Sequence, residues 1–191
     1  DRDQSRGLGD VYKRQSAGRF LSLEGAVIQM INHGITSGAL FMLVGFIYDR
    51  RHTRRISDFG GLKQSMPIYA GVFLFTSFAS IGLPGLNGFV GEFMILMGSF
   101  PTFQFLSSIA AFGVVLAAIY MLWAYQRMFN GKLIHEENKE IHDLNSKELV
   151  AVAPLLLLML FIGIYPSFIE SYVLQDVSVI YESINNILGE S

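Results

Sequence analysis

Two ionisable side chains lie inside long apolar stretches of the sequence. Glu92 is the only charged residue in the stretch 66–100, and His33 lies in the apolar run 23–48. A carboxyl in an apolar interior can take up a proton from one side and release it to the other when its surroundings change. An imidazole changes its charge near neutral pH. These residue types in these places predict proton transfer.

The stretch that carries Glu92 must bend or break. A straight helix over 66–100 would reach roughly 50 Å, whereas the hydrocarbon core of a membrane is about 30 Å thick. The helix-breaking residues in this stretch are Gly82, Pro84, Gly85 and Gly88. Broken backbone at membrane depth survives only where it is buried in protein or lines a polar cavity, and discontinuous helices recur at the ion sites of transporters. A broken helix beside an acid therefore predicts ion translocation.

The distribution of charge indicates the fold class. Hydrophobic residues make up 51% of the chain and charged residues 16%, and nearly all the charge falls in residues 1–19, 49–63 and 127–148. The windows between these blocks are long and apolar enough to cross a membrane. We expect an all-α polytopic membrane protein with a short, mildly acidic surface helix after its last span. The four expected spans are 23–48, the broken helix 66–100, 103–129 and 149–168.

Basic residues predict the orientation of these spans. Lys and Arg gather in the loop after the first span and in the loop after the third, whereas the turn at Pro101 has neither. Cytoplasmic loops carry an excess of Lys and Arg. We therefore expect loops 49–65 and 130–148 in the cytoplasm and the C-terminus on the far side. Residues 132–147 are rich in Glu, Asn, Lys and His and are expected to form an exposed linker.

Composition excludes several function classes. A net charge of -2, divided among short loops, leaves no basic face for nucleic acid. The chain has no cysteine to form disulfides or to ligate iron–sulfur clusters, so redox centres would lie in a partner. It shows no phosphate-binding loop or dinucleotide fingerprint. We therefore expect no cofactor and no metal in this chain.

The candidate residues also have structural interpretations. Glu92 could be neutral or ion-paired and join two helices, although acids at membrane depth mark functional sites by default. His33 could form a hydrogen bond across a helix interface, or it could relay protons on the face that it shares with Gln29. Both interpretations of His33 remain open. Glu24 lies near the far-side end of its run, where we expect an interfacial charge that water can reach.

The first residues differ from the rest of the chain. Residues 1–15 are polar, do not begin with Met and lack the apolar core of a secretory signal. They resemble translated sequencing-adaptor read-through, so we expect this segment to be non-native. Residues 16–191 would then be the C-terminal part of a longer membrane domain.

Three runs of the sequence resemble one family. They are residues 29–34 (Gln-Met-Ile-Asn-His-Gly), 48–54 (Tyr-Asp-Arg-Arg-His-Thr-Arg) and 81–93, which runs from Ile-Gly-Leu-Pro-Gly to Gly-Glu-Phe. Together they closely resemble subunit M of bacterial respiratory complex I, whose mitochondrial counterpart is subunit 4. The resemblance covers roughly residues 20–190.

This resemblance implies a fold, a location and partners. Members are antiporter-like subunits of the membrane arm, with fourteen helices in two inverted repeats, and this chain would hold the last four. The chain would lie in the bacterial inner membrane and contact adjacent antiporter-like subunits and the lipid bilayer. NADH, FMN, iron–sulfur clusters and quinone would belong to partner subunits. The subunit would translocate protons for NADH:quinone oxidoreductase without redox chemistry of its own.

The resemblance also implies roles for two residues. In the family, the second broken helix carries the ionisable residue that completes the proton route. Paralogous subunits and Mrp-type cation/proton antiporters generally have Lys there, so Glu92 favours subunit M. His33 matches a histidine on the hydrophilic axis in the preceding helix, whereas the Glu and Lys of the first repeat would lie upstream.

Two other classes stay open. An Mrp-type antiporter or a membrane-bound hydrogenase subunit would show sodium dependence or different gene neighbours. A structural membrane scaffold would tolerate neutral residues at both Glu92 and His33.

Overall fold

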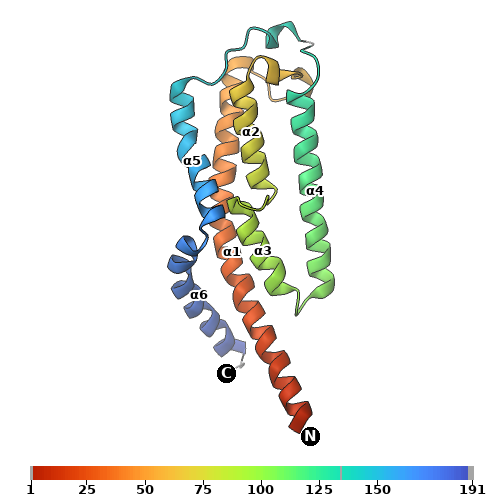
Figure 1. Ribbon diagram of the computed structural model, residues 1–191, viewed down its shortest axis with the longest axis vertical. Coiled ribbons are helices and arrows are strands. Elements are labelled where there is room, and N and C mark those ends of the chain that lie inside the picture. The colour runs from red at the N-terminus through yellow and green to blue at the C-terminus, as the bar shows by residue number, and fades with distance from the viewer. Residues whose placement is uncertain (1, 134, 189–191) are drawn as a thin grey trace.

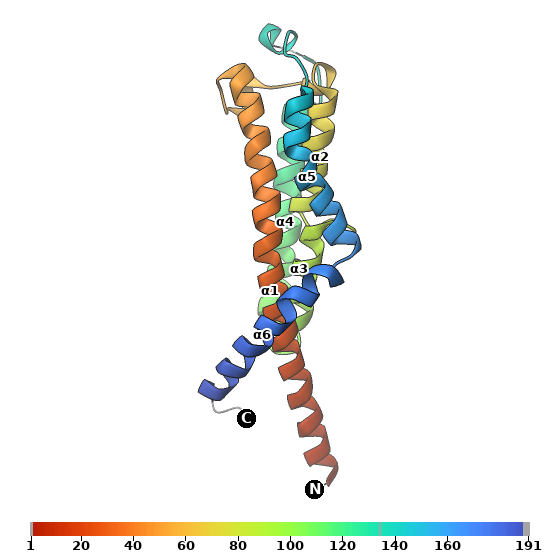
Figure 2. The same ribbon diagram turned by 90° about the vertical axis from the view of Figure 1, so that its left-hand side faces the viewer.

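The computed structural model describes the backbone of residues 2–133 and 135–188, and the side chains of residues 17–133 and 135–187. All the regular elements in these residues are helical. They are α1 (Arg2–Arg51), η1 (Ile56–Asp58), η2 (Leu62–Gln64), α2 (Pro67–Ser80), α3 (Asn87–Ser99), α4 (Gln104–Phe129), η3 (Glu136–Asn138), α5 (Ser146–Ile164) and α6 (Ser167–Leu188). Figure 1 shows α1 running along the whole molecule, with α2 and α3 stacked end to end beside it. The helix α6 crosses the lower part of α1, as Figure 2 shows from the side.

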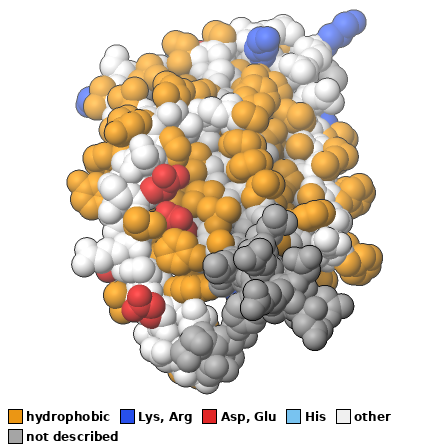
Figure 3. Space-filling view, turned by 60° about the horizontal axis from the view of Figure 1, so that its bottom comes forward, with side chains coloured by type: hydrophobic (Ala, Val, Ile, Leu, Met, Phe, Trp, Pro, Cys, Tyr) orange, Lys and Arg blue, Asp and Glu red, His pale blue; other side chains and the backbone are white. Residues whose placement is uncertain are grey.

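The chain has the apolar helices of a membrane protein. Among the described residues, three helices are long and apolar enough to cross a membrane: Ala17–Arg51 within α1, the whole of α4, and the whole of α5. Most of the apolar side chains of α4 are exposed, which suits a helix that contacts lipid. Figure 3 shows apolar side chains over most of one face, with few acidic or basic groups among them. The all-α membrane class is therefore confirmed.

Two of the predicted spans have different ends in the structure. The first is longer than 23–48, because α1 continues in both directions, from Arg2 to Arg51. The fourth, predicted at 149–168, runs across a helix boundary. The helix α5 ends at Ile164, and α6 begins at Ser167 after Tyr165 and Pro166. A residue before proline is disfavoured in the helical conformation, so the helix ends there.

The predicted second span is two short helices. The helix α2 begins with Pro67 in its first turn, where a missing N–H costs nothing, and α3 begins at Asn87. The segment 81–86 lies between them. The third predicted span, 103–129, coincides with α4, which ends before Asn130 and Gly131, a glycine with φ +91°.

The two basic loops meet at one end of the molecule. The N–H of Gly61 donates to the carbonyl of Asn130 at 3.1 Å, and Asn138 Nδ2 donates to the carbonyl of Asp58 at 3.1 Å. Hydroxyls of Thr53 and Ser57 donate to the Asp58 carboxylate and lower its pKa. The connection 132–147 is therefore not simply an exposed linker, because it is bonded to the other loop and Asn138 within it is fully buried.

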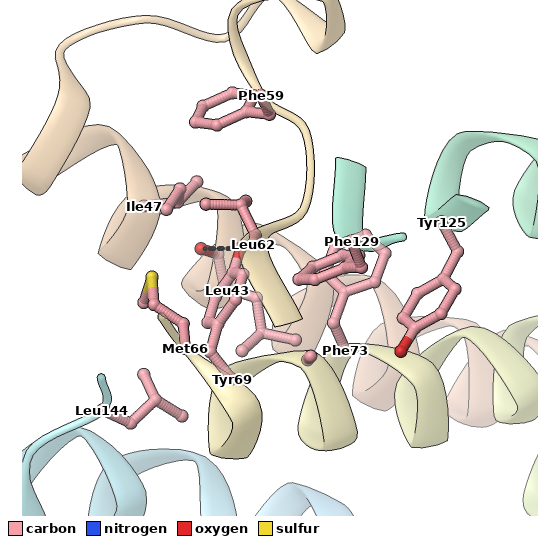
Figure 4. Packing of buried hydrophobic residues seen from close by; sticks show 11 residues of the cluster. Leu43, Ile47, Phe59, Leu62, Met66, Tyr69, Phe73, Tyr125, Phe129 and Leu144 are labelled. Atoms are coloured by element: carbon pink, nitrogen blue, oxygen red, sulfur yellow. Dashed lines mark hydrogen bonds between the residues drawn. The ribbon is translucent and has the colours of Figure 1, made fainter. Parts of the chain in front are cut away.

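An aromatic cluster holds α1, α2 and α4 together at this end (Figure 4). The rings of Tyr125 and Phe129 lie 4.7 Å apart between centroids, and those of Phe73 and Phe129 lie 5.1 Å apart. The Tyr69 hydroxyl donates to the carbonyl of Leu43 at 3.0 Å, which gives this buried polar group a partner. The cluster therefore fixes α2 against α1 and α4 on one side of the break.

On the other side of the break, glycines bring α3 close to α1. A Cβ on Gly18 would lie 2.6 Å from the carbonyl oxygen of Gly98, and a Cβ on Gly25 would lie 2.7 Å from the Cβ of Met94. Small residues at an interface allow helix backbones to approach closely in membranes. The half-helix α3 thus packs on the lower half of α1, and this contact positions the residues at its start.

Candidate functional site

The backbone adopts positive φ angles at two glycines in the break between α2 and α3. Gly82 has φ +71° and Gly85 has φ +92°, a region that side chains with a Cβ rarely adopt. Backbone N–H groups just after α2 donate to carbonyls in its last turns. Ile81 donates to the carbonyl of Ser77 at 3.0 Å, and Leu83 donates to the carbonyl of Phe78 at 3.0 Å. The structure thus places Gly82 and Gly85 at the two positions where the turn requires glycine.

The break is packed against neighbouring backbone. A Cβ on Gly88 would collide with the carbonyl oxygen of Ala79, so the start of α3 lies directly on the last turn of α2. A Cβ on Gly163 of α5 would collide with the backbone of Gly85 and Leu86. The unwound segment is therefore covered on these sides by protein, the condition under which irregular backbone is tolerated at membrane depth. Pro84 lies on its exposed side.

The Glu92 carboxyl lies between α1 and this break. Its Oε1 accepts a hydrogen bond from Gln29 Nε2 at 3.3 Å. Its Oε2 occupies the place where a Cβ on Gly82 would stand. Glu92 is partly buried, so its carboxyl is confined by α1 on one side and by the turn of the break on the other.

Buried amides continue from Gln29 along α1. Asn32 Nδ2 donates to the Gln29 Oε1 atom at 3.4 Å and to the carbonyl of Asn87 at 2.7 Å. Asn87 Nδ2 returns a hydrogen bond to the carbonyl of Asn32 at 3.3 Å and another to the Thr36 hydroxyl at 3.3 Å. Asn32 and Asn87 are 1% and 0% exposed. A hydrogen-bonded polar chain therefore joins the start of α3 to Glu92 through α1.

His33 is exposed, and no hydrogen bond to Glu92 is found in the part of the chain that the structure describes. His33 lines a small polar cavity of about 20 Å³, together with Gln29, Asn32, Thr36, Ala79, Ser80 and Gly88. That volume is about what one water molecule needs. Gln29 lines the cavity and also donates a hydrogen bond to Glu92. His33 lies about one helical turn after Gln29 on α1, on the same cavity.

Sequence reasoning missed two features of this region. Asn87 was visible only as part of the helix-breaking run, and its pairing with Asn32 depends on how α1 and α3 pack. Glu24 is buried, at 7% exposed, rather than accessible to water as expected. The sequence feature that could have indicated the burial of Glu24 is its position as an acid inside an apolar run.

The fold and this site define the class of the protein: a polytopic all-α membrane protein built around a broken helix that carries an acid. Residues 14–119 match the family described as "NADH:quinone oxidoreductase/Mrp antiporter, TM", and the chain belongs to this family.

Individual relatives agree with this assignment. The chain is 43% identical over 167 residues to NADH-quinone oxidoreductase subunit M of Rhodobacter capsulatus, an alignment that covers 87% of this chain and 33% of that protein. The expected resemblance to subunit M is confirmed. The chain spans about a third of the length of these curated relatives.

Solved structures have the same fold. A chain of respiratory complex I from Thermus thermophilus with bound NADH superposes with a TM-score of 0.77 and 30% identity, over 86% of this chain and 34% of that one. A chain of the Mrp complex from Dietzia sp. DQ12-45-1b gives a TM-score of 0.72 at 18% identity, over 87% of this chain and 39% of that one, and shows the fold alone. The antiporter-like fold is thus common to both kinds of complex.

Proposed function

We propose that this chain is the C-terminal part of a subunit M that translocates protons in NADH:quinone oxidoreductase, with Glu92 and His33 as proton-carrying groups. The observation that carries the proposal is the Glu92 carboxyl, which is held against a helix break and linked through Gln29 to the cavity lined by His33. A carboxyl is well suited to this task because it can bind and release a proton without moving far. The similarity to subunit M supports the same assignment.

In this proposal α2 and α3 together form the second of four spans, within a longer fold of fourteen helices in two inverted repeats. The two basic loops at one end of the molecule face the cytoplasm of a bacterial inner membrane, and α6 lies on the far side. Adjacent antiporter-like subunits and lipid cover the exposed apolar side chains. NADH, FMN, iron–sulfur clusters and quinone are bound by partner subunits, and quinone reduction there drives proton transfer here.

Within this scheme His33 lies on the route toward the remainder of the longer protein. It lines the polar cavity on one side and is exposed on the other. An imidazole at this place can pass a proton between the cavity and groups outside the described residues. Glu92 then serves as the terminal donor toward the far side.

The test is Glu92→Gln in the full-length subunit, assembled in its complex and studied in inverted membrane vesicles. Because the amide has the same shape but cannot carry a proton, proton translocation coupled to NADH oxidation is expected to be abolished or greatly reduced. Glu182→Gln is the matched control, since Glu182 is exposed on α6 and should leave translocation unchanged. Undiminished translocation in the Glu92→Gln variant would contradict the proposal, and translocation that requires sodium would favour an Mrp-type antiporter instead.

A further inference from the structure

We infer that Gln29 is a positioning residue for Glu92: its amide, fixed by Asn32 and Asn87, keeps the carboxyl turned toward α1. This inference rests on the proposed role of Glu92 in proton transfer. It concerns how the carboxyl is oriented rather than whether it carries the proton.

The two oxygens of the Glu92 carboxyl have different surroundings. Oε1 receives the N–H of Gln29 at 3.3 Å. Oε2 lies against the Gly82 backbone, in the space that a side chain at this position would fill. A half turn of the carboxyl would only exchange its two oxygens, but any smaller rotation would lengthen the Gln29 hydrogen bond or press an oxygen against the Gly82 backbone. Gln29 therefore selects one orientation from those that the space permits.

Gln29 is itself held in place. Its Oε1 accepts from Asn32 Nδ2 at 3.4 Å, so the amide is oriented with its N–H groups toward Glu92. On the α3 side, a Cβ on Gly91 would collide with Gln29 Oε1 and lie 2.8 Å from Gln29 Cβ. Only a glycine at this position leaves room for the Gln29 side chain between the two helices.

The next pair of amides anchors this arrangement to the start of α3. Asn32 and Asn87 each donate to the other's backbone carbonyl, at 2.7 Å and 3.3 Å, and both are buried. Each Nδ2 group has a partner in this pairing, whereas Oδ1 of Asn32 and Oδ1 of Asn87 are buried with no hydrogen-bond partner among the described residues. Because a buried donor without a partner is costly, the two donated bonds favour this pairing of α1 with α3. A displacement of the start of α3 would therefore move Asn32 and, through it, Gln29.

An amide is chemically suited to this position. It donates to a carboxylate oxygen when Glu92 is ionised and to the carbonyl oxygen when Glu92 is protonated. It does not titrate, so it does not compete for the proton. Gln29 can thus keep the carboxyl oriented in both states of the transfer, and orientation is a large factor in the rate of such steps.

The main test is Gln29→Met in the full-length subunit within its assembled complex, because Met fills a similar volume with an unbranched chain and removes the amide. The infrared band of the protonated Glu92 carbonyl, identified as the band that Glu92→Gln removes, is expected to move to higher frequency on loss of its donor. Proton translocation is expected to fall by about tenfold, since misplacement by about 1 Å can cost a hundredfold. Gln126→Leu, which removes an exposed amide from α4, is the control that should change neither.

The outcomes separate this inference from the proposed function. An unmoved band, or a moved band with unchanged translocation, would overturn the positioning role while leaving Glu92 as the proton carrier. Translocation that survives Glu92→Gln would instead overturn the proposed function. If Gln29→Met prevents assembly, Gln29→Asn makes the same test, because it keeps a buried amide but withdraws it from Glu92 by one methylene group.

Discussion

The Arg50 guanidinium at the end of α1 forms a bidentate salt bridge with the Glu148 carboxylate in the first turn of α5. Nη1 lies 2.7 Å from Oε1, and Nη2 lies 2.6 Å from Oε2. The Nε and Nη2 atoms of the same guanidinium donate to the carbonyls of His142 and Asp143. Glu148 also accepts the N–H of Asn145 at 2.8 Å and so completes the capping box of α5. One ion pair thus ties two membrane helices to the loop between α4 and α5.

Arg50→Ala is expected to destabilise the protein. The two side chains are 17% and 16% exposed, so the pair lies between a surface salt bridge and a buried one. Loss of one partner should lower the free energy of unfolding by about 1–3 kcal/mol. Arg50→Lys should lose less stability, because Lys keeps the positive charge. Some loss should remain, because Lys lacks the planar guanidinium that binds both carboxylate oxygens. Denaturant unfolding of the detergent-solubilised protein would measure both values.

Arg55→Ala is the control for this comparison. Arg55 is exposed in the same basic loop and belongs to no ion pair among the described residues. Its replacement should change the free energy of unfolding by less than about 0.5 kcal/mol. Equal losses at Arg50 and Arg55 would show that the ion pair with Glu148 adds nothing.

A second link from the same loop reaches the start of α2. The Asp143 carboxylate accepts the N–H groups of Ile68 and Tyr69 at 2.7 Å and 2.9 Å. These are first-turn donors that have no partner within their own helix. Asp143→Ala should therefore speed hydrogen exchange at both amides, with a loss of about 0.5–2 kcal/mol of local stability. Native-state exchange followed by mass spectrometry would detect it.

Asn145→Ala provides the cross-check, because Asn145 caps α5 rather than α2. It should speed exchange at the start of α5 and leave Ile68 and Tyr69 unchanged. Faster exchange at the start of α2 in both variants would mean that the loop loosens as a whole, and the specific role of Asp143 would be rejected.

The sequence was sufficient to predict the features that depend on local chemistry. The break follows from glycine and proline in an apolar run, and Glu92 stands out because no other charge lies near it. The Asn32–Asn87 pair and the Asp143 cap could not be predicted, because each joins residues far apart in the chain. Their partners depend on how α1 packs on α3 and on the path of the loop after α4. The end of α5 was predicted too late, because Pro166 lies within a continuous run of apolar residues.

The contact between Gly82 and Glu92 can be separated from the strain of the turn by comparing two glycines. Both Gly82 and Gly85 have positive φ, so alanine at either position should cost about 1 kcal/mol or more in backbone strain. Only at Gly82 would the new Cβ meet the Glu92 carboxyl, whereas no described atom lies within 4 Å of a Cβ on Gly85.

Gly82→Ala should therefore lower both the free energy of unfolding and, in the assembled complex, proton translocation. Gly85→Ala should lower stability by a similar strain but leave translocation close to that of the unmodified protein. Parallel measurement of unfolding in detergent and of translocation in vesicles gives both quantities for each variant. If the two alanine variants lose translocation equally, then the turn's conformation matters to the activity and its contact with the Glu92 carboxyl does not.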